Sequence, residues 1–121
     1  MALKESGEMY LETIYILSQD KGNVRSIDIS REMGYSKPSV SRAIRVLKRE
    51  GYITINENSL INLTEAGREI ASNIYERHNV LSDFLMELGV DKDTAIEDAC
   101  RAEHYISDTT FQAIKNRNQN K

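Results

Sequence analysis

The chain has 121 residues, of which 40% are hydrophobic and 29% charged, with a single proline; this composition indicates a globular domain and excludes a disordered tail. One cysteine excludes an internal disulfide, no apolar stretch is long enough for a transmembrane helix, and the N-terminus lacks the basic-then-apolar pattern of a signal peptide. The net charge of −3 divides into +5 over residues 21–52, where eight side chains are basic and three acidic, and −8 elsewhere. We therefore expect a cytoplasmic protein without membrane association, with one face that binds phosphates.

Apolar residues at helical spacing predict a first helix over residues 7–19. Ser26 is expected to cap a second helix over residues 27–33, and Gly34 suits the left-handed position that ends it. The residues expected to face the core from these two helices are Tyr10, Ile14, Leu17, Ile29 and Met33.

Ser36 is expected to cap a third helix that reaches residue 50, with Pro38 in its first turn, where the missing N–H costs nothing. Two short helices joined by a tight glycine turn indicate a helix-turn-helix. Alternating residues over 52–55 and 60–63, separated by turn-forming residues, predict a β-hairpin. This order of elements predicts a winged helix-turn-helix domain over residues 1–63.

The second half of the chain is expected to be entirely helical. Its predicted elements are a long helix that Thr64 caps and Gly89 closes, a fifth helix over residues 92–106, a short sixth helix capped by Ser107 or Asp108, and a polar, frayed tail over residues 115–121. Together they form a second domain over residues 64–121.

The face of the third helix opposite its apolar stripe is the candidate for contact with DNA. The N-terminal residues of this helix meet base edges in a helix-turn-helix, and Arg42 is the candidate reader because a guanidinium bonds guanine O6 and N7 together. The order of turn, caps and hairpin disfavours the alternative that these charges are only a solvated helix face. The predicted DNA-binding residues are Ser36, Lys37, Pro38, Ser39, Ser41, Arg42 and Arg45.

Six residues from three helices are candidate metal ligands: Met9 and Glu12, then His78, then Cys100, Glu103 and His104. The last three are spaced i, i+3, i+4, which puts a thiolate, a carboxylate and an imidazole on one helical face, donors that suit a borderline transition metal. His78 lies on an apolar helix face, where an unpaired imidazole would be costly. The alternative is structural: a core cysteine, a surface Glu–His pair and a satisfied core histidine.

The chain resembles the diphtheria toxin repressor family of metal-dependent regulators over about residues 7–110. The resemblance rests on EMYLETIY (8–15), SKPSVS (36–41), LTEAG (63–67), RH (77–78) and EDACRAEH (97–104). It implies a transcriptional repressor, not an enzyme, that binds operator DNA as a homodimer when Fe²⁺ or Mn²⁺ binds and controls metal-homeostasis genes. The implied fold is mainly α, a winged helix-turn-helix DNA-binding domain followed by a helical metal-binding and dimerisation domain.

The resemblance also implies which residues bind the activating ion. The iron branch uses positions matching Met9, Cys100, Glu103 and His104, and sulfur at two of them favours iron, with Zn²⁺, Co²⁺ or Ni²⁺ as surrogates. Glu12 and His78 match ligand positions of the manganese branch, so the set is mixed.

An ancillary site of the iron branch would need ligands at Ser82 and Ile96, and we expect it to be eroded unless Asp83 or Glu12 compensates. The third domain of longer family members has no counterpart before residue 121, as expected of a two-domain form or a shortened chain. Three rival interpretations stay open: a metal-independent winged-helix regulator, a small metallohydrolase using the Cys–Glu–His set, and a protein-interaction module.

Overall fold

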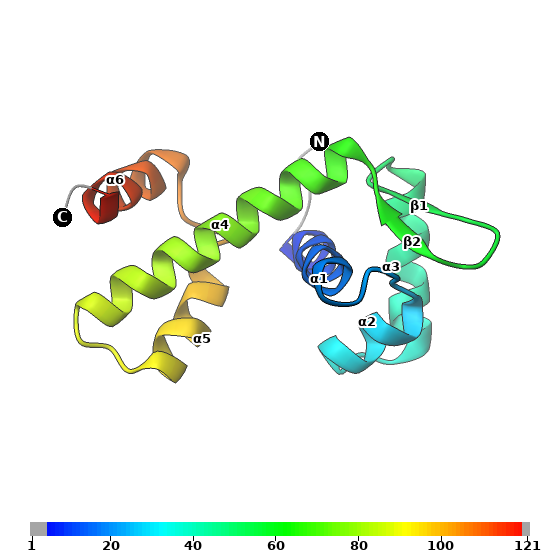
Figure 1. Ribbon diagram of the computed structural model, residues 1–121, viewed down its shortest axis with the longest axis horizontal. Coiled ribbons are helices and arrows are strands. Elements are labelled where there is room, and N and C mark those ends of the chain that lie inside the picture. The colour runs from blue at the N-terminus through cyan, green and yellow to red at the C-terminus, as the bar shows by residue number, and fades with distance from the viewer. Residues whose placement is uncertain (1–4, 120–121) are drawn as a thin grey trace. The chain divides into compact units, whose positions relative to one another are not determined.

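The computed structural model describes residues 5–119, which divide into two compact units at residues 72 and 73. The described elements are α1 (Glu5–Lys21), α2 (Ser26–Met33), α3 (Lys37–Arg49), β1 (Ile53–Ile55), β2 (Ile61–Leu63), α4 (Glu65–Glu87), α5 (Lys92–Ala102) and α6 (Asp108–Gln119) (Figure 1). The predicted mainly α architecture, a winged helix-turn-helix followed by helices, is confirmed. No helix within residues 5–119 combines the length and the hydropathy that a membrane crossing requires.

The first unit is built around one apolar cluster shared by α1, α2, α3 and the hairpin. The predicted stripes of α1 and α3 are buried in it, whereas Met33 of α2 is only partly buried. The buried members are Tyr10, Leu11, Ile14, Leu17, Val24, Ile29, Val40, Ile44, Leu47, Ile53, Ile61 and Ala71. Because apolar burial fixes one face of α3, the polar face of that helix points to solvent.

The turn between α2 and α3 follows the predicted chemistry. Gly34 has φ 72° and ψ 20°, and its N–H donates to the Ser30 carbonyl at 2.9 Å. At the start of α3, the N–H of Ser39 donates to Ser36 Oγ at 3.3 Å, and Pro38 lies in the first turn. The glycine therefore lets the chain reverse between the helices, and the serine cap sets where α3 begins.

The predicted cap of α2 is wrong, because the helix already includes Ser26 and its cap is Arg25. The Ile61 N–H donates to the Val24 carbonyl at 2.7 Å, which holds the chain extended up to Arg25. The Arg25 N–H donates to Asp28 Oδ2 at 2.9 Å, and the Lys21 ammonium donates to Oδ1 at 2.6 Å. These two donors, the lysine first, hold the pKa of Asp28 below its ordinary value.

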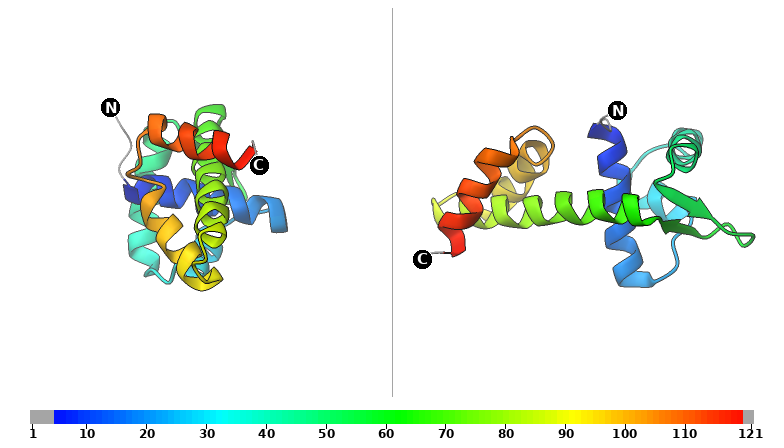
Figure 2. Two further views of the ribbon diagram at one scale, coloured as in Figure 1. Left: turned by 90° about the vertical axis from the view of Figure 1, so that its left-hand side faces the viewer. Right: turned by 90° about the horizontal axis from the view of Figure 1, so that it is seen from above.

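The wing is an antiparallel pair in which Ile53 faces Leu63 and Ile55 faces Ile61. Each strand begins one residue later than predicted. The Asn56 side chain accepts the N–H groups of Asn58 and Leu60, which shapes the connecting loop. Figures 1 and 2 show this loop projecting from the helices of the first unit.

The base of the wing is joined to the first turn of α4 by a close backbone approach. Thr64 caps α4 as predicted, accepting the Gly67 N–H at 3.2 Å, and its hydroxyl donates to the Gly51 carbonyl at 2.7 Å. Gly67 is buried against Tyr52, and a Cβ at Gly67 would lie 2.1 Å from the Tyr52 carbonyl oxygen. The residue at 67 must therefore lack a side chain for these two backbones to pack.

Gly67→Ala is expected to lower the free energy of unfolding by about 1–3 kcal/mol, because the obstructing atom is backbone and cannot rotate away. Helix propensity alone predicts the opposite sign, a gain of up to about 1 kcal/mol. Urea unfolding of the apo protein measures the change. The exposed neighbour Arg68, changed to alanine, is the control and should shift stability by less than about 0.5 kcal/mol. Unchanged or increased stability of Gly67→Ala would contradict the close approach.

In the second unit, the prediction that the fifth helix reaches Ile106 is wrong, because α5 ends at Ala102. The N–H groups of Tyr105 and Ile106 both donate to the Ala102 carbonyl at 3.0 Å, which closes a tight turn. Ser107 then caps α6, because its hydroxyl accepts the Thr110 N–H at 3.1 Å. Of the two predicted caps, Ser107 and Asp108, the structure shows the first.

Helix α6 is longer than predicted and continues through residues expected to fray; residues 120–121 of that tail lie outside the described part. Its polar side chains hold it against α4. Lys115 Nζ lies 3.2 Å from Glu76 Oε1, and Asn118 Nδ2 donates to the Val80 carbonyl at 3.3 Å. The tail therefore forms a helix through contacts with α4 and not through its own apolar pattern.

Candidate metal centre and DNA-binding surface

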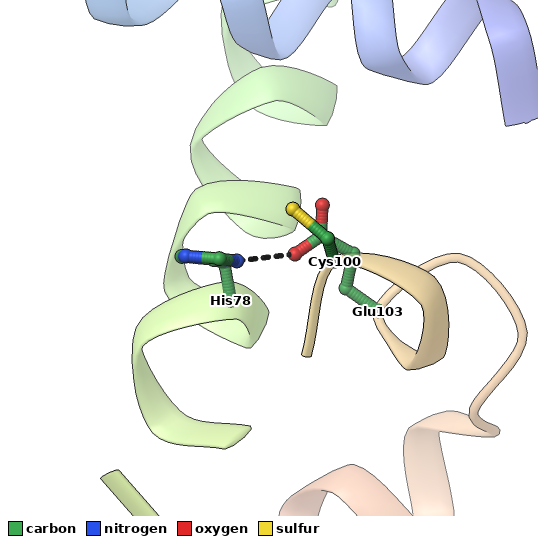
Figure 3. A group of neighbouring side chains, drawn as sticks. All are labelled: His78, Cys100 and Glu103. Atoms are coloured by element: carbon green, nitrogen blue, oxygen red, sulfur yellow. Dashed lines mark hydrogen bonds and ion pairs between the residues drawn. The ribbon is translucent and has the colours of Figure 1, made fainter. Parts of the chain in front are cut away.

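The second unit brings a histidine of α4 against a glutamate at the end of α5. His78 Nδ1 lies 3.0 Å from Glu103 Oε2, and the glutamate side chain is only 1% exposed (Figure 3). Burial of a carboxylate this complete is costly unless a cation or strong donors balance it. The pair is therefore the centre of the candidate site.

Cys100 lies one helical turn before Glu103 and points into the same space (Figure 3). The donor atoms of Cys100, Glu103 and His78 all lie within 4.8 Å of one another. Ligands bound to one ion at about 2.0–2.3 Å are separated by at most about twice that distance, so only a small adjustment would let all three share an ion. A nitrogen, a sulfur and a carboxylate oxygen form a donor set that fits a borderline transition metal.

His104 reaches the same carboxylate from the other side. Its Nε2 lies 3.3 Å from Glu103 Oε1, so Glu103 has one imidazole at each oxygen. The prediction that His104 shares a helical face with Cys100 is wrong, because His104 lies in the turn after α5. That turn nevertheless keeps His104 beside Glu103.

The remaining predicted ligands, Met9 and Glu12, lie on α1 in the first unit, three residues apart and thus on a shared helical face. The structure also describes the two positions at which the expected ancillary site would need further ligands, Ser82 and Ile96. Ser82 is buried and donates its hydroxyl to the His78 carbonyl at 2.8 Å, while Ile96 has no ligand atom and is 37% exposed. Asp83 is exposed.

The contacts of Arg77 are not predictable from the sequence, where this residue stands out only as part of the RH motif at 77–78. The Arg77 guanidinium donates to the backbone carbonyls of Glu103 and Ile106, at 3.3 and 2.8 Å. The sequence offers no local signal for this contact, because the partners lie 26 and 29 residues further along the chain.

The predicted DNA-binding residues lie on the solvent side of α3 and its N-terminal turn. All are exposed except Ser39, which is partly buried and whose hydroxyl accepts from Ser36 Oγ at 2.9 Å. Arg42 Nη2 lies 3.4 Å from the same hydroxyl, so the arginine is oriented along the helix surface. Just before α3, the exposed Tyr35 ring lies 6.0 Å from the buried Tyr10 ring of α1, centroid to centroid, and burial raises the pKa of Tyr10. The helix therefore presents a polar, basic face to solvent, opposite its buried apolar stripe.

Two family models together match nearly all of the chain. Residues 2–59 match the family described as iron dependent repressor, N-terminal DNA binding domain, and residues 64–120 match its metal binding and dimerisation domain. The chain is 32% identical over 115 residues to an HTH-type transcriptional regulator of Methanocaldococcus jannaschii, covering 93% of this chain and 92% of that protein. It is 30% identical over 109 residues to the transcriptional regulator MntR of Lysinibacillus sphaericus, covering 90% and 78%.

Solved structures show the same likeness. The manganese regulator SloR superposes with a TM-score of 0.83 at 28% identity, covering 98% of this chain and 55% of that one. A manganese-dependent transcriptional repressor in complex with manganese gives a TM-score of 0.81 at 28% identity, covering 92% and 51%. The present chain thus spans about half the length of these solved chains. It belongs to the iron-dependent repressor family, whose members are metal-dependent, DNA-binding transcriptional regulators and not enzymes.

Proposed function

We propose that this chain represses metal-homeostasis genes in the cytoplasm, binding operator DNA as a homodimer when Fe²⁺ or Mn²⁺ occupies a centre formed around Glu103. The observation that carries the proposal is the buried Glu103 carboxylate, with His78 at one oxygen, His104 at the other, and the Cys100 thiol within reach. When bound, a divalent cation would balance the buried negative charge and join α4 to the end of α5.

The identity of the ion is proposed from the donor types. A thiolate at Cys100 is a soft ligand, which favours Fe²⁺ over Mn²⁺, with Zn²⁺, Co²⁺ and Ni²⁺ as surrogates in vitro. The carboxylate and the two imidazoles also suit Mn²⁺. The site should therefore bind Fe²⁺ more tightly than Mn²⁺. Replacement of Cys100 by aspartate should bring the two affinities closer together.

Met9 and Glu12 are proposed as further ligands on the family resemblance alone. The boundary between the DNA-binding and metal-binding domains is proposed at residues 63 and 64, where α4 begins with the Thr64 cap and where the second family match also begins.

On the DNA side, the exposed face of α3 is proposed to enter the major groove. Two copies of α3 in a homodimer would read half-sites about 34 Å apart, or a multiple of this spacing. Arg42 is proposed to read a base, whereas Lys37 and Arg45 are proposed to contact phosphates, with Ser36 and Ser39 at the helix N-terminus.

Fluorescence anisotropy with a duplex selected from a random pool tests the proposed function, under anaerobic conditions and at fixed salt. Affinity is expected to rise about 5- to 150-fold on addition of Fe²⁺ or Mn²⁺ and to return to its starting value with chelator. Tight binding that does not respond to metal would support a metal-independent regulator. A protein that binds no duplex with any metal would instead favour a protein-interaction module.

A further inference from the structure

Two consecutive residues of α4, Arg77 and His78, both contact Glu103 at the end of α5. His78 contacts the Glu103 carboxylate, and Arg77 donates to the Glu103 backbone carbonyl from Nη1 at 3.3 Å. The same Nη1 donates to the Ile106 carbonyl at 2.8 Å. Arg77 therefore spans the turn over residues 103–106, which carries two of the proposed ligands.

The Arg77 side chain is itself held in place from a second direction. Its guanidinium lies 5.2 Å from the centroid of the Phe111 ring, and its Nη2 lies 3.7 Å from Asp108 Oδ1. The Arg77 side chain is 19% exposed and Phe111 is buried. The arginine is thus packed between the ligand-bearing turn and the first turns of α6.

We propose that Arg77 is a positioning residue of the metal centre, fixing the 103–106 turn so that Glu103 and His104 face His78. This inference rests on the proposed metal centre. A turn after a helix C-terminus has carbonyl groups without intrahelical partners, and Arg77 supplies a donor to two of them. When the turn is already ordered, metal binding does not have to supply the ordering free energy.

Lysine cannot reproduce this arrangement in full. The planar guanidinium places several donors in a fixed fork and stacks on an aromatic ring, whereas an ammonium is a single flexible point of charge. Arg77→Lys should therefore keep one carbonyl contact and the charge, and Arg77→Met should lose both. The two variants separate positioning from charge.

Cobalt titration followed by near-ultraviolet and visible absorption tests the proposal, because binding through the Cys100 thiolate gives a sulfur-to-cobalt charge-transfer band in the near ultraviolet. Arg77→Met is expected to bind Co²⁺ about 10- to 100-fold more weakly, with a changed band, and Arg77→Lys to recover part of the loss. Lys115→Met is the matched control: it also removes one positive charge and an α4–α6 contact, the one to Glu76, and the described contacts of Lys115 do not include the 103–106 turn. Its Co²⁺ affinity should stay within twofold of the parent.

Amide hydrogen exchange of the metal-free proteins gives a second readout. The N–H groups of Tyr105 and Ile106, which donate to the Ala102 carbonyl, should exchange faster in Arg77→Met and at the parent rate in Lys115→Met. If Arg77→Met does not fold, Arg77→Lys alone must show the weaker affinity and the changed band. If the parent binds Co²⁺ and Arg77→Met binds it equally well, the positioning role of Arg77 is overturned, but the proposed metal centre is not. A parent that binds no Co²⁺, Mn²⁺ or Fe²⁺ would overturn the proposed metal centre and this inference with it.

Discussion

Glu103→Gln is expected to abolish metal-stimulated DNA binding while leaving metal-free DNA binding at the parent level. The amide has almost the shape of the carboxylate, so the buried space stays filled, but the anionic ligand between His78 and His104 is lost. Since loss of an outer-shell partner already costs about 10- to 100-fold in metal affinity, loss of the central carboxylate should cost more. Anisotropy with and without chelator measures the response, and direct Co²⁺ or Mn²⁺ titration measures the affinity.

A matched control is available on α5, the helix that Glu103 caps. Glu97 is 70% exposed and its carboxylate lies 3.6 Å from an Arg101 nitrogen, so Glu97→Gln changes the charge equally without touching the centre. It should behave as the parent in both assays. A Glu103→Gln protein that still gains operator affinity with metal would remove Glu103 from the centre and return the buried cluster to a structural role.

The first unit could be predicted closely because its signals are local. A serine cap with a proline in the next turn fixes where α3 starts, and a glycine at φ 72° ends α2. The apolar stripe of α3 then decides which face is buried. The error at α2 has a distant cause: the chain before Arg25 is held by a backbone bond from Ile61, on β2.

The candidate centre could be predicted in part, because some of its residues are also close together in the sequence. Cys100 and Glu103 converge because three residues make almost one helical turn, and Glu103, although it caps α5, keeps helical φ and ψ. The place of His78 on an apolar helix face predicts that its imidazole has a polar partner, and in the structure the Glu103 carboxylate lies beside it. No spacing rule could show that this partner would be Glu103, because the pair is 25 residues apart.

The end of α5 could not be predicted, because the residues from Ala99 to Ile106 contain no glycine or proline to stop a helix. The turn there is fixed by Arg77, through the Glu103 and Ile106 carbonyls, and by the Ser107 cap of α6. The length of α6 also depends on contacts with residues far away in the sequence. Its polar pattern predicts fraying, whereas Lys115 and Asn118 hold it through partners 39 and 38 residues away.

Arg42→Ala is expected to reduce the preference for operator over scrambled DNA by about 1–3 kcal/mol, which is a factor of about 5 to 150. The side chain is exposed on α3 and its one described hydrogen bond, to Ser39 Oγ, is long at 3.4 Å, so stability should change little. Metal affinity should be unchanged. Competition anisotropy with operator and scrambled duplexes, at several salt concentrations and saturating metal, measures both specificity and salt dependence.

Arg45 provides the comparison, because it is exposed on the same helix one turn further along and has the same charge. As a proposed phosphate contact, Arg45→Ala should weaken binding to both duplexes equally and reduce the slope of log affinity against log salt by about 1. Arg42→Ala should instead act mainly on the operator duplex. If it also weakens both duplexes equally, Arg42 binds a phosphate, and the base-reading residue lies among the other exposed side chains at the start of α3.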